Sequence, residues 1–208
     1  MIKIFLCIFL IFLSSSYLRA SSIYDFQINS FGLGDSLIRH FTMEEINEGI
    51  KNEYAHDDKY VNIQIKSSEI EDLNENNRVN LKIEIEDVDN QYVFAVDTED
   101  NHLTVHSIGI GKFYLNDTIS ECLSYKDSTL AHFKSIFPNI DPDSYESPYD
   151  DLDDGKSIAY VTDFKLDEGS VRIYCVDWSA ETTKKRNWED NFQIKLSTSK
   201  FVEWLSDK

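Results

Sequence analysis

Segments in which apolar and polar residues alternate recur along most of this chain. The clearest spans residues 59–66, where Val61, Ile63 and Ile65 alternate with polar residues. A period of two places the apolar side chains on one face of a strand and the polar ones on the other. Further segments with strand patterns occupy residues 23–29, 79–88, 92–97, 103–111, 157–166, 170–178 and 191–197. So many short, half-buried strands favour a fold built on a large sheet.

The links between several of these segments are short and polar. One such link separates residues 79–88 from 92–97, and another, which contains Gly169, separates 157–166 from 170–178. Short polar links between alternating segments are typical of β-hairpins. We therefore expect these two pairs to form hairpins within a largely antiparallel sheet.

One segment has the pattern of a long amphipathic helix. Its apolar residues at helical spacing are Ile119, Cys122, Leu123, Leu130, Phe133 and Phe137. Thr118 and Glu121 have the spacing of a capping box, and Pro138 ends the segment. Shorter helices are expected at 37–41, 43–50 and 199–205. The sequence thus predicts an α+β protein, in which one long helix and shorter helices pack on the sheet.

The first twenty residues have the layout of a secretory signal peptide. Lys3 precedes an unbroken apolar run from Ile4 to Leu13, and small residues follow up to Ala20. A run of this length is shorter than the 20 or so residues that span a bilayer. We expect residues 1–20 to be removed, and residues 21–208 to form a single secreted domain, periplasmic in a bacterium.

The remaining domain is strongly acidic. The whole chain has a formal net charge of −18, which becomes −20 without residues 1–20, since that segment carries two basic residues and no acid. This charge disfavours nucleic acid and anionic membrane surfaces as partners. After cleavage we expect no stable insertion in a membrane, and a protein partner or a divalent ion suits the charge better.

Two cysteines remain after residue 20, and an oxidising compartment favours a disulfide between them. Cys122 lies on the apolar face of the long helix, while Cys175 shares a strand face with Val171 and Ile173. The two would meet if that strand lay under the helix. Two buried free thiols are the alternative.

Two similar phrases, FQINSFGLGDSL at 26–37 and LTVHSIGIGKFYL at 103–115, each contain Gly-x-Gly. Leu37 and Tyr114 stand where a dinucleotide fingerprint needs its third glycine, so neither phrase is a phosphate cradle. We expect two strands that end in similar sharp turns. A duplicated strand-turn-helix unit is the alternative to chance similarity.

An acidic stretch at 139–156 holds seven acids and one lysine. Its residues do not fit an EF-hand, because Leu152 and Val161 fall at liganding positions. A calcium site of another kind, made by Asp150, Asp153 and Asp154, is one hypothesis. The other is a solvated acidic loop with no bound metal.

All three tryptophans, Trp178, Trp188 and Trp204, lie near the C-terminus. The only basic cluster, Lys184-Lys185-Arg186, lies between the first two. Aromatic residues beside charges of both signs are typical of protein contacts, and aromatic rings also stack on sugars. We therefore name Trp178, Lys184, Lys185, Arg186 and Trp188 as candidate interaction residues, with an ordinary solvated loop as the alternative.

Catalytic signatures do not stand out. The chain has no Gly-x-Ser-x-Gly elbow, and His102 and His106 provide only two of the three or four ligands that zinc requires. No catalytic residue can therefore be assigned, and the chain gives more support to a binding protein than to an enzyme.

The segments FGLGDSLIRHF, IYCVDWS and FVEWL resemble small secreted proteins of AT-rich bacteria. That group has no assigned activity, so the resemblance implies no catalytic residues. The leading hypothesis is a binding or protein-interaction module of the cell envelope. The alternatives are a calcium- or carbohydrate-binding protein that uses the acidic loop 141–154, and a hydrolase.

Overall fold

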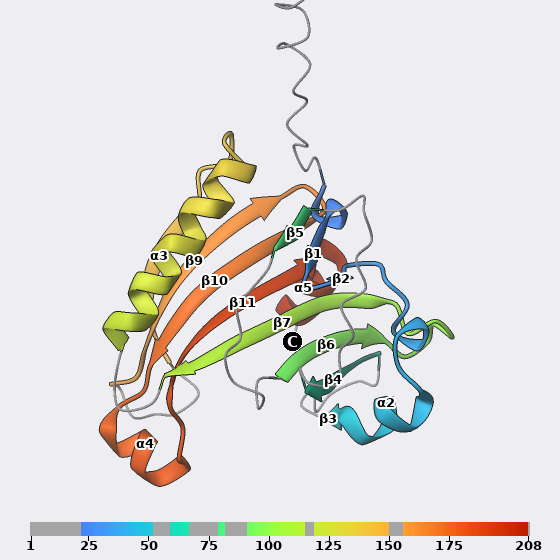
Figure 1. Ribbon diagram of the computed structural model, residues 1–208, viewed down its shortest axis with the longest axis horizontal. Coiled ribbons are helices and arrows are strands. Elements are labelled where there is room, and N and C mark those ends of the chain that lie inside the picture. Colours follow the sequence, from blue (N-terminus) through green and yellow to red (C-terminus); the bar gives the residue numbers. More distant parts are fainter. Residues whose placement is uncertain are drawn as a thin grey trace, which may run out of the picture.

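The computed structural model describes residues 22–51, 59–66, 79–81, 91–114, 119–149 and 156–207. The expected signal segment, residues 1–20, and the start of the expected domain at residue 21 lie outside the described residues. Figure 1 shows a strongly twisted sheet with a long helix along one side. The predicted α+β class, with an antiparallel sheet packed by one long helix and shorter helices, is confirmed.

Eight strands form the main sheet, in the order β3-β4-β6-β7-β11-β10-β9-β8. Their bounds are β3 (Ile50–Lys51), β4 (Tyr60–Lys66), β6 (Gln91–Asp97), β7 (Val105–Tyr114), β11 (Asp190–Thr198), β10 (Gly169–Asp177), β9 (Ile158–Leu166) and β8 (Asp143–Pro148). Every neighbouring pair is antiparallel. The hairpin predicted for 157–166 and 170–178 is confirmed as β9 and β10.

Helix α3 (Ile119–Ile136) covers one face of this sheet and carries the apolar residues that its pattern predicts. Cys122 on α3 forms a disulfide with Cys175 on β10, with their Cα atoms 6.1 Å apart. Phe133 is fully buried on the same helix. The predicted disulfide is therefore confirmed, together with the placement of this strand under the helix.

A small second sheet packs on the same side as α3. It consists of β2 (Phe31–Gly32), β1 (Phe26–Ile28) and β5 (Val79–Leu81), in that order. Phe26 on β1 stacks on Phe133 and Phe137, with ring centroids 5.9 and 4.9 Å apart. This contact joins the N-terminal segment to the main core.

Two strand predictions need correction here. The hairpin expected between 79–88 and 92–97 is wrong, because β5 pairs in parallel with β1, whereas β6 pairs with β4 and β7. Because β4 and β7 occupy both edges of β6, no edge of β6 is left to pair with the preceding segment. The strand expected from residue 23 also begins later, since Ile23–Asp25 is a 3₁₀ turn that Ser22 caps.

The two Gly-x-Gly phrases do not share a conformation. In the first, Gly34 has a φ of 84° and lies in a turn before the short 3₁₀ helix Leu37–Arg39. In the second, Gly109 and Gly111 lie within the continuous strand β7, so the expected turn is wrong there. The phrases instead lie side by side, as the Gly34 N–H donates to the Val105 carbonyl over 2.9 Å. A duplicated strand-turn-helix unit does not describe them.

Helix α5 (Ser199–Ser206) packs on the face of the sheet opposite to α3. Its Phe201 forms a small separate cluster with Tyr60, Ala95 and Trp204. Helix α2 (Met43–Gly49) lies within the helix expected at 43–50, begins with a capping box between Thr42 and Glu45, and packs against β4. None of the helices within the described residues is long and apolar enough to cross a membrane.

Candidate functional site

A cavity of about 480 Å³ lies at the end of the main sheet, on the face opposite to α3. Its aromatic lining residues are Phe113, Tyr149, Trp178 and Trp188. Its polar lining residues are Asn187, Glu189, Asn191 and Gln193. Asn187 and Trp188 of this lining directly follow helix α4 (Ala180–Arg186). Figure 1 shows that α4 connects β10 to β11. Its volume lies within the range typical of small-molecule sites.

Strand register explains why these side chains meet. Asn191 pairs with Phe113 on β7 and with Val176 on β10, so all three point to the same face. Trp178 follows Val176 by two residues and therefore continues that face beyond the strand. Gly111 pairs with Gln193 and provides no side chain beside it. No side chain at position 111 therefore covers the amide of Gln193 on the neighbouring strand.

Helix α4 brings the second tryptophan back over the first. Ser179 caps the helix by accepting a hydrogen bond from the Thr182 N–H, and Asn187 ends it with a φ of 55°. This left-handed residue reverses the chain direction, so that Trp188 lies 4.8 Å from Trp178 between ring centroids. The loop expected between the tryptophans is therefore a capped helix.

The aromatic rings form a corner, since they meet at large angles. Tyr149 contacts Trp178 at 4.6 Å with an interplanar angle of 67°, and Trp188 is inclined to Trp178 by 54°. Trp178 is 7% exposed, whereas Trp188 is 36% and Phe113 52% exposed. The corner therefore has a buried base and exposed outer rings.

Of the five predicted interaction residues, three come together. The guanidinium of Arg186 lies 4.8 Å from the centroid of the Trp188 ring, which in turn packs on Trp178. Lys184 and Lys185 are exposed on α4 and do not line the cavity. Phe113, Tyr149 and the amides were not predicted.

A chain of hydrogen bonds fixes the polar wall. The Tyr174 hydroxyl donates to Gln193 Oε1, and Gln193 Nε2 donates to Asn191 Oδ1 over 2.7 Å. Asn191 Nδ2 then donates to the Glu189 carbonyl over 3.0 Å. Burial raises the pKa of Tyr174, and the nearby Tyr149 acts in the same direction, so this phenol stays protonated and donates at neutral pH.

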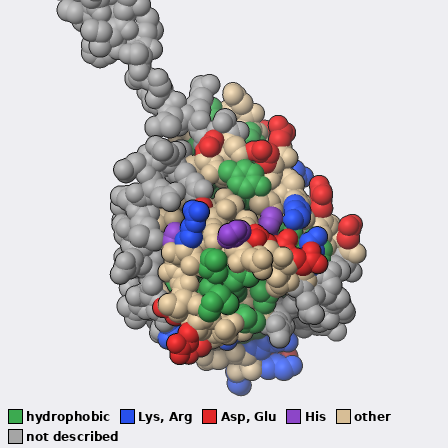
Figure 2. Space-filling view, turned by 90° about the vertical axis from the view of Figure 1, so that its right-hand side faces the viewer, with side chains coloured by type: hydrophobic (Ala, Val, Ile, Leu, Met, Phe, Trp, Pro, Cys, Tyr) green, Lys and Arg blue, Asp and Glu red, His purple; other side chains and the backbone are tan. Residues whose placement is uncertain are grey.

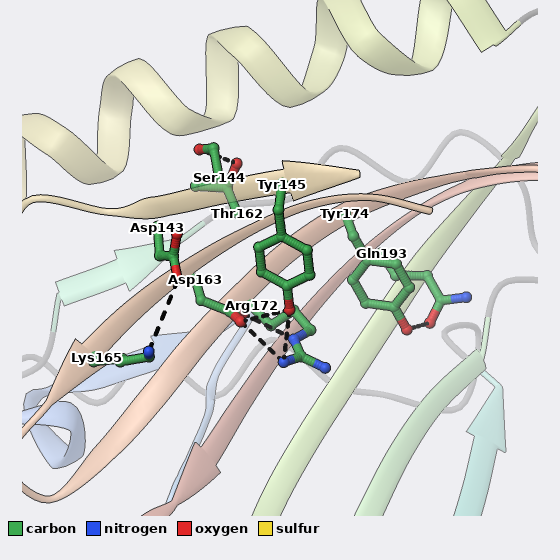
Figure 3. A network of polar contacts seen from close by, with 9 residues as sticks. All are labelled: Asp143, Ser144, Tyr145, Thr162, Asp163, Lys165, Arg172, Tyr174 and Gln193. Atoms are coloured by element: carbon green, nitrogen blue, oxygen red, sulfur yellow. Dashed lines mark hydrogen bonds and ion pairs between the residues drawn. The ribbon is translucent and has the colours of Figure 1, made fainter. Parts of the chain in front are cut away.

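A second cluster of polar side chains lies next to this chain of hydrogen bonds, on the same face of the sheet (Figure 3). Arg172 donates to both carboxylate oxygens of Asp163, over 2.8 and 2.9 Å, and the Tyr145 hydroxyl donates to Asp163 over 3.1 Å. Figure 3 shows these side chains beside Tyr174 and Gln193, with α3 beyond the sheet. The bonds to Asp163 raise the pKa of Arg172, which therefore stays charged.

The acidic segment is only partly described. Asp143–Pro148 forms edge strand β8, so this part is not a loop as expected. Asp150, Asp153 and Asp154 lie outside the described residues, and the calcium site that they would form stays a prediction. Within the described residues, no group of three His, Cys, Asp or Glu side chains could hold a metal ion.

A charged cluster at the other end of the sheet anchors α5. Lys200 on α5 forms an ion pair with Asp97 at 3.3 Å, and His106 Nδ1 lies 3.2 Å from the Thr198 hydroxyl that caps the helix. Tyr60 contacts the imidazole of His106 edge to face at 5.3 Å. On the face drawn in Figure 2, histidine, basic and acidic side chains lie close together.

This cluster predicts a pH dependence of stability. Burial, and then the charge of Lys200, lower the pKa of His106, while Asp97 and Asp100 oppose this and Lys59 adds to it. The unfolded chain therefore takes up the proton first as pH falls through about 6.5, and the folded state loses stability below that pH.

The variant His106→Gln is expected to reduce this loss. Its free energy of unfolding in urea should fall less between pH 7.5 and 5.5 than that of the unmodified protein. His132→Gln on α3 serves as the control and should keep the original pH dependence. If the free energy of unfolding falls equally for the protein and its His106 variant over this pH range, the predicted contribution of His106 is contradicted.

No protein-family model matches this chain, nor does any curated protein or solved structure. The geometry of the site is therefore the basis for a functional proposal.

Proposed function

We propose that this chain is a secreted binding protein of the cell envelope, whose ligand enters the aromatic cavity beside Trp178 and Trp188. The signal-like segment at 1–20 and the disulfide between Cys122 and Cys175 both suit an oxidising compartment outside the cytoplasm. The observation that carries the binding role is the cavity itself, since it joins an aromatic corner to a wall of fixed amides.

The residue types in the cavity favour binding over catalysis. Asn187, Asn191 and Gln193 supply amides, which hydrogen-bond but do not titrate near neutral pH. Asn191 is only 3% exposed, and its hydrogen bonds hold the amide in one orientation. A preorganised polar wall lowers the entropic cost of binding a ligand.

A protein partner is the second candidate ligand. Phe113 and Trp188 are large exposed aromatic residues at the cavity mouth, and Tyr145 is exposed further along the same face. Exposed aromatic side chains often anchor protein interfaces. In this case a side chain of the partner protein would enter the same aromatic cavity and pack against Phe113 and Trp188.

The test uses the three indole N–H signals in the NMR spectrum of the purified protein. Trp178 and Trp188 report on the cavity, whereas Trp204 packs on Tyr60 at the α5 end and serves as an internal control. The probes are neutral sugars, choline and indole. A probe that enters the cavity should shift the first two signals and leave that of Trp204 unchanged. If none of the probes shifts them, binding of small ligands in this cavity is contradicted.

Replacement of Trp188 by alanine should weaken binding of any such ligand about tenfold or more. The change removes an exposed ring from the corner, and aromatic anchors at binding sites are commonly worth about 2 kcal/mol. Lys184→Ala, an exposed change on the same helix α4, is the matched control and should bind normally. Equal affinities of the two variants would exclude the corner as the binding site. The measurement is a titration calorimetry series with the probe that gives the largest shifts.

A further inference from the structure

We infer that the ligand is a neutral oligosaccharide, an inference that rests on the binding function proposed above. A sugar ring presents C–H groups on its faces and hydroxyl groups around its edge. It therefore fits a site where aromatic rings stand next to groups that both donate and accept hydrogen bonds. The cavity combines these two kinds of wall within a single volume of about 480 Å³.

The aromatic corner suits a non-planar ring. Tyr149 and Trp188 meet Trp178 at 67° and 54°, so the rings do not form the parallel sandwich that suits a flat aromatic ligand. Rings at these angles contact C–H groups from more than one direction. The buried Nε1–H of Trp178 lacks a hydrogen-bond partner within the described residues, which is costly for an indole.

The amide wall suits hydroxyl groups. The nitrogen of each amide carries two N–H groups, and one of these is used in the bonds from Gln193 to Asn191 and from Asn191 to Glu189. Among the described residues, the second N–H of each makes no hydrogen bond and can donate to a ligand, and each amide oxygen has a further lone pair. Hydroxyl groups can both donate and accept, so they satisfy such a wall. A purely apolar ligand would bury the N–H and C=O groups of this wall without hydrogen-bond partners.

The charges around the cavity argue against an ionic ligand. The guanidinium of Arg186 already lies over the ring of Trp188, which disfavours a cation in the corner. Glu189 lines the same cavity and disfavours an anion. A neutral polar ligand avoids both repulsions.

The same face extends beyond the cavity. Tyr145 and Tyr174 both pair with Val161, and Tyr174 also pairs with Gln193, so these residues form one row across the sheet. Arg172 lies two residues before Tyr174 and holds Asp163 in a fixed planar pair. Figure 3 shows this polar row beside the amide of Gln193. A chain of sugars with one unit in the corner would place its next unit over these side chains.

The experiment is an array of neutral glycans that covers glucose, galactose, mannose and N-acetylhexosamine linkages, with choline and indole measured separately by NMR. We expect at least one tetrasaccharide to bind and to shift the Trp178 and Trp188 signals. We also expect its affinity to exceed that of its monosaccharide. Shifts with choline or indole and none with any glycan would overturn the oligosaccharide inference and leave the binding function intact. If no probe shifts these signals, the oligosaccharide inference and the proposed binding function are both overturned.

Gln193→Leu separates a sugar from an apolar ligand. This half-buried position keeps its shape and loses its amide, so affinity for the tetrasaccharide should fall about tenfold, while indole should bind no more weakly than before. Gln64→Leu, at a half-buried glutamine on β4, is the matched control and should bind the glycan normally. Unchanged glycan affinity in the Gln193 variant would also overturn the inference.

Discussion

The double variant Cys122→Ala/Cys175→Ala is expected to lose up to about 4 kcal/mol of its free energy of unfolding. The disulfide has a sequence separation of 53 residues, and a cross-link over such a loop removes much of the freedom of the unfolded chain. Both cysteines are fully buried between α3 and β10, so loss of the two sulfur atoms also weakens core packing.

The measurement is urea unfolding of the protein and of the double variant at pH 7. Unfolding of the unmodified protein in dithiothreitol provides the control, because it removes the cross-link without any change of side chain. We expect the double variant and the reduced protein to lose similar amounts of unfolding free energy. A loss below about 1 kcal/mol in both would contradict a stabilising role for the disulfide.

Phe133→Ala is expected to lower the free energy of unfolding by about 3–5 kcal/mol. Phe133 is completely buried, and its ring lies 5.9 Å from Phe26 and 5.7 Å from Phe164 between centroids. It therefore joins three elements, namely α3, the N-terminal strand β1 and strand β9. Truncation leaves a cavity at the point where these elements meet.

Phe113→Ala is the matched control for this change, because the same substitution is made at a ring that is 52% exposed. Its effect on unfolding should lie within about 0.5 kcal/mol, as is usual for surface positions. Similar losses of unfolding free energy in the Phe133 and Phe113 variants would show that burial of the ring does not determine the destabilisation. In that case, the described core would not account for the stability of the protein.

Local sequence patterns predicted much of this fold because several elements are determined by nearby residues. The period-two alternation of Ile63 and Ile65 identified β4, and helical spacing around Phe133 identified α3. The disulfide was also predictable, since Cys122 and Cys175 each lie on a face that their own element buries. In these cases, local pattern and tertiary burial agree.

Pairing between distant segments was harder to predict. Residues 79–81 carry the pattern of a strand but give no sign that they pair with Phe26–Ile28. The turn expected at the glycines of the second phrase was wrong for a related reason. A Cβ at Gly111 would lie 3.2 Å from the Phe192 carbonyl oxygen on β11, so close approach of strands explains this glycine better than a turn does.

The candidate site was predicted in part. Trp178, Arg186 and Trp188 were selected because aromatic and charged residues cluster there, and they do meet. Asn191 and Gln193 were missed, although they alternate with the buried Phe192 and Ile194 and so belong to the opposite face of β11. Only the strand order brings this amide face next to Phe113, and strand order depends on contacts between distant segments.

The most direct test of the ligand site is a crystal structure of the protein grown with the tetrasaccharide that gives the largest indole shifts. The account predicts one sugar ring against Trp178 and Trp188, with its hydroxyl groups hydrogen-bonded to Asn191 and Gln193. Density for the sugar at any other place, with the cavity holding only solvent, would contradict it.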